Sequence, residues 1–214
     1  MIRSFRELAS NSESIGNPHT VKLEVSSPSL PSPLQHLYRL HDGAFVFGRA
    51  LLIRPFSSKR GVHGVVEWND PSLWKCKYEL QLRDYVFFAE DAVGFSYCLG
   101  SDHRVYFFDP EQGALEFFTD SVESWLELIS RDPGQVGASL AASWVAEHGE
   151  IPFGYRIPPV VPFIVKESES IGKMLAPELA LAKYRAALAC SVSDAVDDEQ
   201  IQIQSLAEYL REQP

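Results

Sequence analysis

Cysteine is scarce in this chain of 214 residues, and long apolar runs are absent. The three cysteines (Cys76, Cys98 and Cys190) are odd in number and widely spaced. They give no disulfide framework and suit a reducing compartment. The longest apolar runs, such as Val160–Val165, are far too short to span a bilayer. The first residues carry no apolar stretch of the kind found in secretory signals. We therefore expect a cytoplasmic protein.

Motifs for catalysis and for metal binding are also missing. The six histidines show no zinc-binding spacing, and no phosphate-binding loop occurs. The run Gly94–Cys98 resembles a nucleophile elbow only in part, because cysteine stands where that motif ends in glycine. We predict no catalytic residue, no metal and no cofactor. An enzyme would need Glu90, His103 and Asp109 to share one pocket with shifted pKa values.

Positive charge is in short supply, and the acid is concentrated in one segment. The net charge is -10, which argues against binding to the phosphate backbone of nucleic acids. Between Asp84 and Ile129 there are ten Asp or Glu residues and one base, Arg104. Aromatic residues are dense in the same segment. An acidic surface with aromatic side chains suits a basic protein partner.

The apolar content of 45% and the charged content of 22% are those of an ordinary globular protein. Short apolar runs separated by Gly, Asp and Pro predict an antiparallel meander. The predicted strands are Ala44–Phe47, Ala50–Pro55, Val65–Trp68, Tyr85–Ala89, Val93–Leu99, Val105–Asp109 and Leu115–Phe118, with further short strands at Val21–Val25 and Gln200–Gln204. Helical spacing of apolar residues predicts helices over Met1–Ala9 and Ser205–Glu212, and others that begin near Ser32, Asp70, Ser121, Val136 and Leu175.

Aromatic residues alternate along these strands so that both faces of the sheet carry rings. Helices that carry Leu37 and Trp125 are expected to cover one face. The proline-rich segment Ile151–Phe163 either covers the other face or leaves it open for a partner. The acidic residues between the strands are expected in solvated turns.

Several stretches in this order resemble the SUKH superfamily, which includes bacterial immunity proteins and cell-wall-assembly-regulator-like proteins. A helix closes with LYRLHDG at Gly43, the strand pair reads VFFAEDAVGFSYCLG, and a strand and turn read VYFFDPEQG. A Ser-led helix with Trp125 follows. The resemblance covers roughly residues 28–130. The stretch from Leu140 to about Ser205 resembles an extension of some bacterial members.

The resemblance implies an α+β fold with a curved, mainly antiparallel sheet, helices packed mostly on one face, and a C-terminal helical and proline-rich extension. We divide the chain into a domain over residues 1–132 and an extension over residues 133–214 that packs on the same domain. The resemblance also implies a non-enzymatic role, namely that of an immunity-type protein that binds and neutralises a toxin, often a nuclease. An acidic inhibitor would cover the basic residues with which a nuclease binds phosphate. The alternative is a regulatory or scaffolding module without a toxin partner.

Seven residues of the acidic segment are predicted to bind the partner, with no role for nucleic acid or membrane. The carboxylates would complement its charge, and two tyrosines would anchor it. The carboxylates are Glu90, Asp91, Asp102, Asp109 and Glu111, and the tyrosines are Tyr97 and Tyr106.

Overall fold

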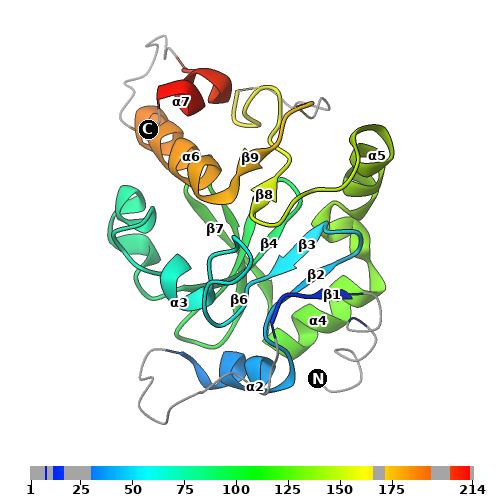
Figure 1. The fold of residues 1–214 in the computed structure, drawn as a ribbon. Coiled ribbons are helices and arrows are strands. Elements are labelled where there is room, and N and C mark those ends of the chain that lie inside the picture. Colours follow the sequence, from blue (N-terminus) through cyan, green and yellow to red (C-terminus); the bar gives the residue numbers. More distant parts are fainter. Residues whose placement is uncertain (1–7, 9–11, 17–29, 166–171, 194–202, 213–214) are drawn as a thin grey trace.

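The computed structural model describes residues 8, 12–16, 30–165, 172–193 and 203–212. In this part of the chain, a seven-stranded antiparallel sheet lies at the centre, with its strands side by side in chain order from β1 to β7. Figure 1 shows helices around the sheet. The seven strands are β1 (Ser12–Ser14), β2 (Ala44–Val46), β3 (Leu51–Ile53), β4 (Val86–Asp91), β5 (Ser96–Leu99), β6 (Val105–Asp109) and β7 (Ala114–Thr119).

The predicted α+β class and the antiparallel meander are confirmed. A separate two-stranded sheet joins β8 (Tyr155–Arg156) to β9 (Ala176–Pro177). The helices of the described residues are α2 (Ser32–Leu40), α3 (Val65–Trp68), α4 (Val122–Arg131), α5 (Ala138–His148), α6 (Glu178–Ser193) and α7 (Leu206–Glu212), with two 3-10 segments, η2 (Lys75–Leu82) and η3 (Pro133–Val136).

One face of the sheet is covered by α2 and α4, the helices that were predicted to cover it, and also by α5. Leu37 of α2 and Trp125 of α4 are fully buried in the same apolar cluster. The Trp125 ring packs edge-on against Phe88 of β4, with ring centres 5.0 Å apart. The helix α4 begins where the Ser121 hydroxyl accepts the backbone N–H of Ser124, a capping bond that satisfies an otherwise free donor.

The other face is covered as well, by α3, η2 and α6. Trp74 packs edge-on against Phe87 of β4 at 4.9 Å, and its ring lies 6.1 Å from that of Phe108 of β6. Ala186 and Ala189 of α6 belong to the same buried cluster. Figure 1 shows α3 beside the sheet and α6 above it. The chain therefore covers the rings on this face itself.

The prediction of a strand over Val65–Trp68 is wrong, because these residues form the short helix α3. The Trp68 N–H donates to the Gly64 carbonyl at 2.8 Å, which is a helical bond. The β4 residue Phe87 instead pairs with the side chain of Asn69, whose amide bonds both the N–H and the C=O of Phe87 at 2.8 Å. A run of four residues, three of them apolar, is too short for its pattern to distinguish a strand from a buried helical turn.

Three predicted elements lie wholly or partly outside the described residues. They are the helix over Met1–Ala9, of which only Leu8 is described, the strand over Val21–Val25, and most of the strand over Gln200–Gln204. The last predicted helix is confirmed as α7.

Candidate interaction surface

Four of the seven predicted partner-binding residues are buried, which corrects the expectation that they lie at the surface. Their exposed fractions are 3% for Glu90, 7% for Asp91, 0% for Tyr97 and 1% for Glu111. A buried side chain cannot present its charge or ring to a partner in this conformation. The remaining three, Asp102, Tyr106 and Asp109, retain access to solvent.

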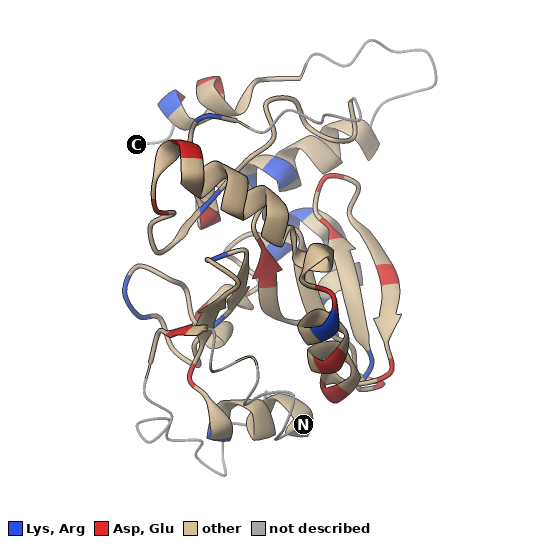
Figure 2. Ribbon diagram, turned by 90° about the vertical axis from the view of Figure 1, so that its right-hand side faces the viewer, with Lys and Arg blue, Asp and Glu red and all other residues tan. Residues whose placement is uncertain are grey.

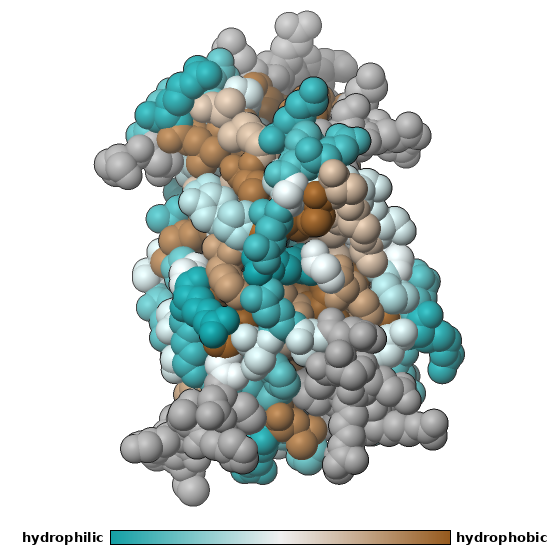
Figure 3. Space-filling model, turned by 45° about the vertical axis from the view of Figure 1, so that its right-hand side comes forward, coloured by the Kyte–Doolittle hydropathy of each residue, from teal (hydrophilic) through white to brown (hydrophobic). Residues whose placement is uncertain are grey.

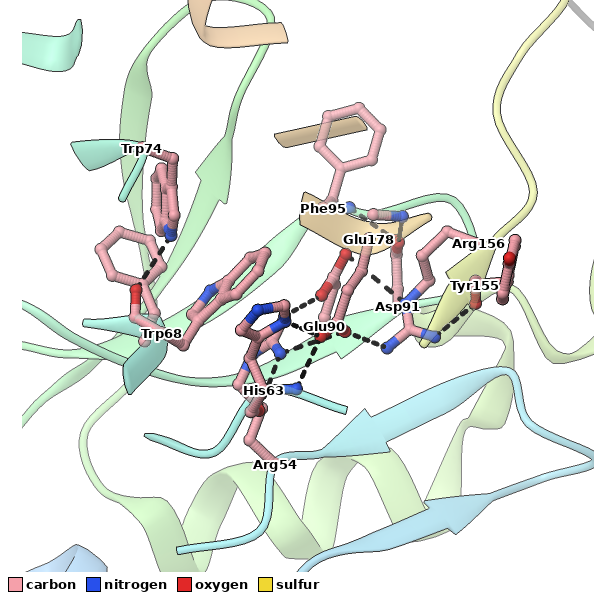
Figure 4. A network of polar contacts seen from close by, with 12 residues as sticks. Arg54, His63, Trp68, Trp74, Glu90, Asp91, Phe95, Tyr155, Arg156 and Glu178 are labelled. Carbon is pink, nitrogen blue, oxygen red and sulfur yellow. Dashed lines mark hydrogen bonds and ion pairs between the residues drawn. The ribbon is translucent and has the colours of Figure 1, made fainter. Parts of the chain in front are cut away.

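Glu90 lies in a buried ionic network that joins the sheet to the C-terminal part of the chain (Figure 4). Its carboxylate pairs with Arg54, which follows β3, and lies 3.5 Å from Nε of Arg156 on β8. The second acid of the network is Glu178, the first residue of α6, whose carboxylate is 3.1 Å from Arg54 Nη1. Two guanidinium groups and two carboxylates thus share one enclosed site. Arg54 also stacks on Trp68, with its Cζ 3.5 Å from the ring centre.

The two carboxylates of this network titrate in opposite directions. Burial raises the pKa of Glu90 above its ordinary value, although Arg156 and Arg54 act against it. Burial acts in the same sense on Glu178, but Arg54, Arg156 and two bonds to His63 outweigh it and lower the pKa of Glu178 to about 2. The backbone N–H of His63 donates to Glu178 at 2.8 Å, and its Nδ1 lies 2.9 Å from the same oxygen. Glu178 is therefore the firmly ionised partner.

Asp91 shapes the turn between β4 and β5. One of its carboxylate oxygens accepts the backbone N–H groups of Val93, Gly94 and Phe95 at 3.0, 2.8 and 2.9 Å. Burial raises the pKa of Asp91 to about 7, despite these bonds. The prediction that Asp91 lies in a solvated turn is wrong, because Asp91 is the last residue of β4 and is buried, and its carboxylate bonds the turn that follows.

Glu111 is paired within the chain in the same way. Nε of Arg185, on α6, donates to its carboxylate at 3.1 Å, and the N–H of Ile164 donates to the other oxygen at 3.1 Å. The cover of Glu90 and Glu111 is supplied by α6, β8 and the proline-rich segment. No local pattern around an acidic turn reveals that residues tens of positions away will cover it.

Tyr97 is buried on the opposite face of the sheet. Its ring lies 5.1 Å from that of Phe118 and 5.4 Å from that of Trp125. Its hydroxyl donates to the carbonyl of Gln135 at 3.0 Å. The helical layer of α4 and η3 therefore encloses it.

The three accessible residues lie along β6 and its two turns. Asp102 accepts the backbone N–H of Arg104 at 3.1 Å and the hydroxyl of Tyr106 at 2.8 Å. Asp109 accepts the backbone N–H groups of Glu111 and Gln112 and thereby closes the turn between β6 and β7. Of the three, Asp102 and Tyr106 form one joint surface feature.

Rings and charges gather around this pair, and we name the group the β6–β7 surface. The ring centre of Tyr106 lies 5.3 Å from that of Tyr85 and 6.3 Å from that of Phe117. The Arg104 guanidinium lies 5.8 Å from the Phe117 ring centre. Phe117 is 55% exposed, which is unusual for a large apolar ring. The β6–β7 surface consists of Tyr85, Asp102, Arg104, Tyr106 and Phe117.

The sequence analysis missed Phe117 and Tyr85 as surface residues. The signal for Phe117 was present, since strand alternation and the expected register put it on the face of Tyr106. What the pattern could not give is the edge position of β7, beyond which no covering element lies among the described residues.

Exposed acid dominates the segment that carries this surface. Five exposed carboxylates and one exposed base, Arg104, lie between Ser101 and Glu127. Across the rest of the molecule, acidic and basic residues are interspersed (Figure 2). The exposed carboxylates are Asp102, Glu116, Asp120, Glu123 and Glu127.

The C-terminal part also encloses a cavity of about 240 Å³, lined by the proline-rich segment, α6 and α7. Val160 and Val165 at its rim are exposed, and Arg185 and Glu111 close its inner end. Figure 3 shows apolar surface in the upper part of the molecule, where Figure 1 places these elements.

The residues that an enzyme would need do not come together. His103 lies in the turn before β6 and Asp109 ends the strand, so the length of β6 separates the two. Glu90 is held in the buried network. Among the described residues, no group of three His, Cys, Asp or Glu side chains could hold a metal ion, and no helix is long and apolar enough to cross a membrane.

An antiparallel sheet with helical cover on both faces defines an α+β domain. Residues 25–128 match the SMI1 / KNR4 family (SUKH-1), and this part of the chain is a domain of that family, as the resemblance predicted. SUKH domains are generally non-catalytic and commonly bind protein partners. No curated protein is detectably similar in sequence to the chain.

Proposed function

We propose that this protein is an immunity-type protein that binds and neutralises a toxin domain, possessing no catalytic activity of its own. The observation that carries the proposal is the β6–β7 surface, where exposed Phe117 lies beside the Asp102–Tyr106 pair, in a segment of the chain that holds five exposed carboxylates. Tyrosine and arginine are enriched at binding hot spots, and aromatic rings serve as anchors. Membership of the SUKH-1 family supports a protein partner.

The excess of exposed acid in the segment between Ser101 and Glu127, which carries most of this surface, indicates the kind of partner. A nuclease toxin binds phosphate through basic residues, and a carboxylate-rich inhibitor accelerates its own association with such a protein and competes with the nucleic acid. Asp102 and Tyr106 keep the roles predicted for them. Glu90, Asp91, Glu111 and Tyr97 do not belong to the binding surface, since the chain's own residues occupy them.

The C-terminal extension has a supporting role in this proposal. We retain the division into a domain over residues 1–132 and an extension over residues 133–214, with the ionic network of Arg54, Glu90 and Glu178 as the joint between them. We also propose that the protein acts in the cytoplasm, where a toxin that enters the cell would meet it.

The test is co-expression of the protein with the toxic domain encoded beside its gene. We expect restored growth and a stable complex on size-exclusion chromatography. Continued cell death without a complex would overturn the proposal. If no toxin gene lies beside the gene of this protein and the protein binds a non-toxic partner, a regulatory or scaffolding module is favoured instead.

A matched pair of variants tests the surface. Phe117→Asp places a charge at the centre of the β6–β7 surface and should weaken binding about 30-fold, the effect of a hot-spot residue. Val66→Asp is the control, since Val66 is exposed to a similar degree (51% against 55%) but lies on α3. Equal losses for both variants would remove the β6–β7 surface from the proposal.

A further inference from the structure

The two edges of the sheet differ in a way that points to how a partner is held. At one edge, β1 has three residues, Ser-Glu-Ser, and is short and polar. At the other edge, β7 has six residues, Ala-Leu-Glu-Phe-Phe-Thr, with a single charge at Glu116. Among the described residues, no strand pairs with the outer side of β7.

Natural sheets protect such edges, because an unpaired edge is a template for another chain. The usual devices are short strands, prolines, lysines and bulges. β1 uses the first of these, whereas β7 contains neither proline nor lysine. A register shift occurs only near its end, after Phe117, and leaves the run from Ala114 to Phe117 regular.

The register identifies which backbone groups of β7 are free. In an antiparallel sheet, the N–H and C=O of successive residues point alternately to the two neighbouring strands. The Gly100 N–H donates to the Arg104 carbonyl, so Arg104 points toward the β5 side. Tyr106 and Phe108, at steps of two, point the same way. A second bond leads to the same assignment. The Asp91 N–H donates to the Phe95 carbonyl, so Phe95 directs its backbone groups toward β4, and the next residue along β5 directs its groups toward β6.

Phe107 lies between Tyr106 and Phe108 and therefore directs its backbone groups toward β7, where its partner is Glu116. Glu116 thus directs its backbone groups inward, to β6. Its neighbours Leu115 and Phe117 direct their N–H and C=O groups outward, to the open side. The exposed ring of Phe117 lies directly beside this open ladder.

We propose that the outer edge of β7 pairs with an extended, basic segment of the partner, which adds an eighth strand to the sheet. Strand addition uses main-chain bonds for affinity and alternate side chains for specificity. The outward groups of Leu115 and Phe117 supply the bonds, and Phe117 supplies an apolar contact. Glu116 and Asp102 supply charge that complements Lys or Arg in the added strand, whereas Asp120 lies 3.7 Å from the chain's own Arg104.

Charge also decides against a second copy of this chain as the occupant. Two β7 edges brought together would oppose the same carboxylates, and like charges on facing strands are destabilising. A basic strand meets no such repulsion. A dimer that forms through β7 would overturn the proposal.

This inference rests on the proposed function, because it states how the toxin domain is held. The test is hydrogen exchange of the backbone amides, followed by NMR, in the complex with the toxin domain. Exchange at Leu115 and Phe117 should slow on binding, while Glu116 is protected before and after. A complex that leaves the exchange at Leu115 and Phe117 unchanged would overturn the strand-addition inference and leave the proposed function standing.

A second arm is independent of the toxin. The probe is an acetylated and amidated octapeptide of alternating lysine and valine, and the control is the same peptide with glutamate in place of lysine. The basic peptide should shift the amide signals of Leu115 and Phe117, and the acidic peptide should not. Equal shifts with both peptides, or shifts elsewhere only, would overturn the inference.

A pair of substitutions at one position isolates the backbone bond. Phe117→Ala removes the ring and keeps the outward N–H, whereas Phe117→Pro removes both, at a strand edge where proline is tolerated. The peptide should still shift the Leu115 signal in the alanine variant and lose this effect in the proline variant. If both variants fold and the peptide shifts the Leu115 signal equally in both, main-chain pairing is contradicted. If the proline variant does not fold, the hydrogen exchange of Leu115 and Phe117 in the wild-type complex decides the question.

Discussion

The guanidinium of Arg54 lies 3.1 Å from the carboxylate of Glu178, although the two residues are 124 positions apart in the chain. Arg54 follows strand β3, and Glu178 begins α6. Both side chains are almost completely buried. This ion pair connects the family-matched domain to the part of the chain that lies beyond it. Substitutions in the pair therefore measure how much this connection contributes to stability.

Glu178→Gln should destabilise the protein strongly. The substitution leaves Arg54 and Arg156 facing the single carboxylate of Glu90, and an unpaired buried charge typically costs about 3–5 kcal/mol. Chemical denaturation measures the loss. The control is Glu147→Gln. The Glu147 side chain is 74% exposed and its carboxylate lies 3.6 Å from Nε2 of His148, so its loss should change the free energy of unfolding by less than about 0.5 kcal/mol. Similar values for both variants would contradict the role of the network.

Asp91 should make the protein more stable at weakly acidic than at neutral pH. Burial raises the pKa of Asp91 to about 7, against about 3.9 in an unfolded chain. Between these values the folded protein holds a proton that the unfolded chain releases. The free energy of unfolding therefore decreases as the pH rises, by up to about 1.4 kcal/mol per pH unit.

The variant Asp91→Asn isolates this contribution, because an amide oxygen can accept the same three backbone bonds and does not titrate. Its free energy of unfolding should decline less than that of the wild type between about pH 5 and about pH 7. Glu178 acts in a lower window: since its pKa is depressed, its stabilisation is lost as the pH falls from about 4 toward 2. Parallel pH profiles of the two proteins would show that Asp91 is not the titrating group.

Gly94→Ala should cost more than Gly149→Ala. The two glycines have almost the same positive φ, +92° and +90°, so an added Cβ strains the backbone at both sites. A Cβ at Gly94 would also lie 2.8 Å from Nη1 of Arg185 and 3.1 Å from Leu181, whereas nothing lies within 4 Å of one at Gly149. Thermal denaturation of the two variants measures the difference, and equal melting temperatures would contradict the close approach of Arg185 to the turn.

Tyr97→Phe should lower stability by about 1 kcal/mol, because its hydroxyl bonds the Gln135 carbonyl inside the helical layer. Tyr106→Phe removes a similar bond to Asp102 at the surface and should leave the free energy of unfolding unchanged, since water replaces the lost partner. Binding should show the reverse order, with Tyr106→Phe weakening the partner complex and Tyr97→Phe leaving it intact. Loss of binding in the Tyr97 variant alone would contradict the assignment of the surface.

Much of the fold could be predicted because its signals are local. Pro33 suits the first turn of α2 through its fixed φ, and the Ser121 hydroxyl caps α4 through a bond within one turn. The turns at Asp91 and Asp109 follow from short side chains that bond the next backbone N–H groups. The resemblance to the SUKH superfamily was carried by this order of local elements.

The exposure of the candidate site could not be predicted in this way. Glu90 and Asp102 both come from the same acidic, aromatic segment, yet the first is enclosed by Arg54 and Arg156 and the second remains at the surface. The difference arises from which part of the chain packs over each residue. α6 and β8 cover Glu90, and nothing among the described residues covers the end of β6.

The sequence by itself determined the class of the fold, its antiparallel meander, the acidic character of the central segment and the family. Only the tertiary structure decided that Glu90, Asp91 and Glu111 serve inside the molecule, and that Phe117 stands at an open edge. The physical reason is the separation along the chain between the residues that interact. Turns and caps form between neighbours in the chain, whereas burial and charge pairing depend on contacts such as that of Arg54 with Glu178, which no local pattern records.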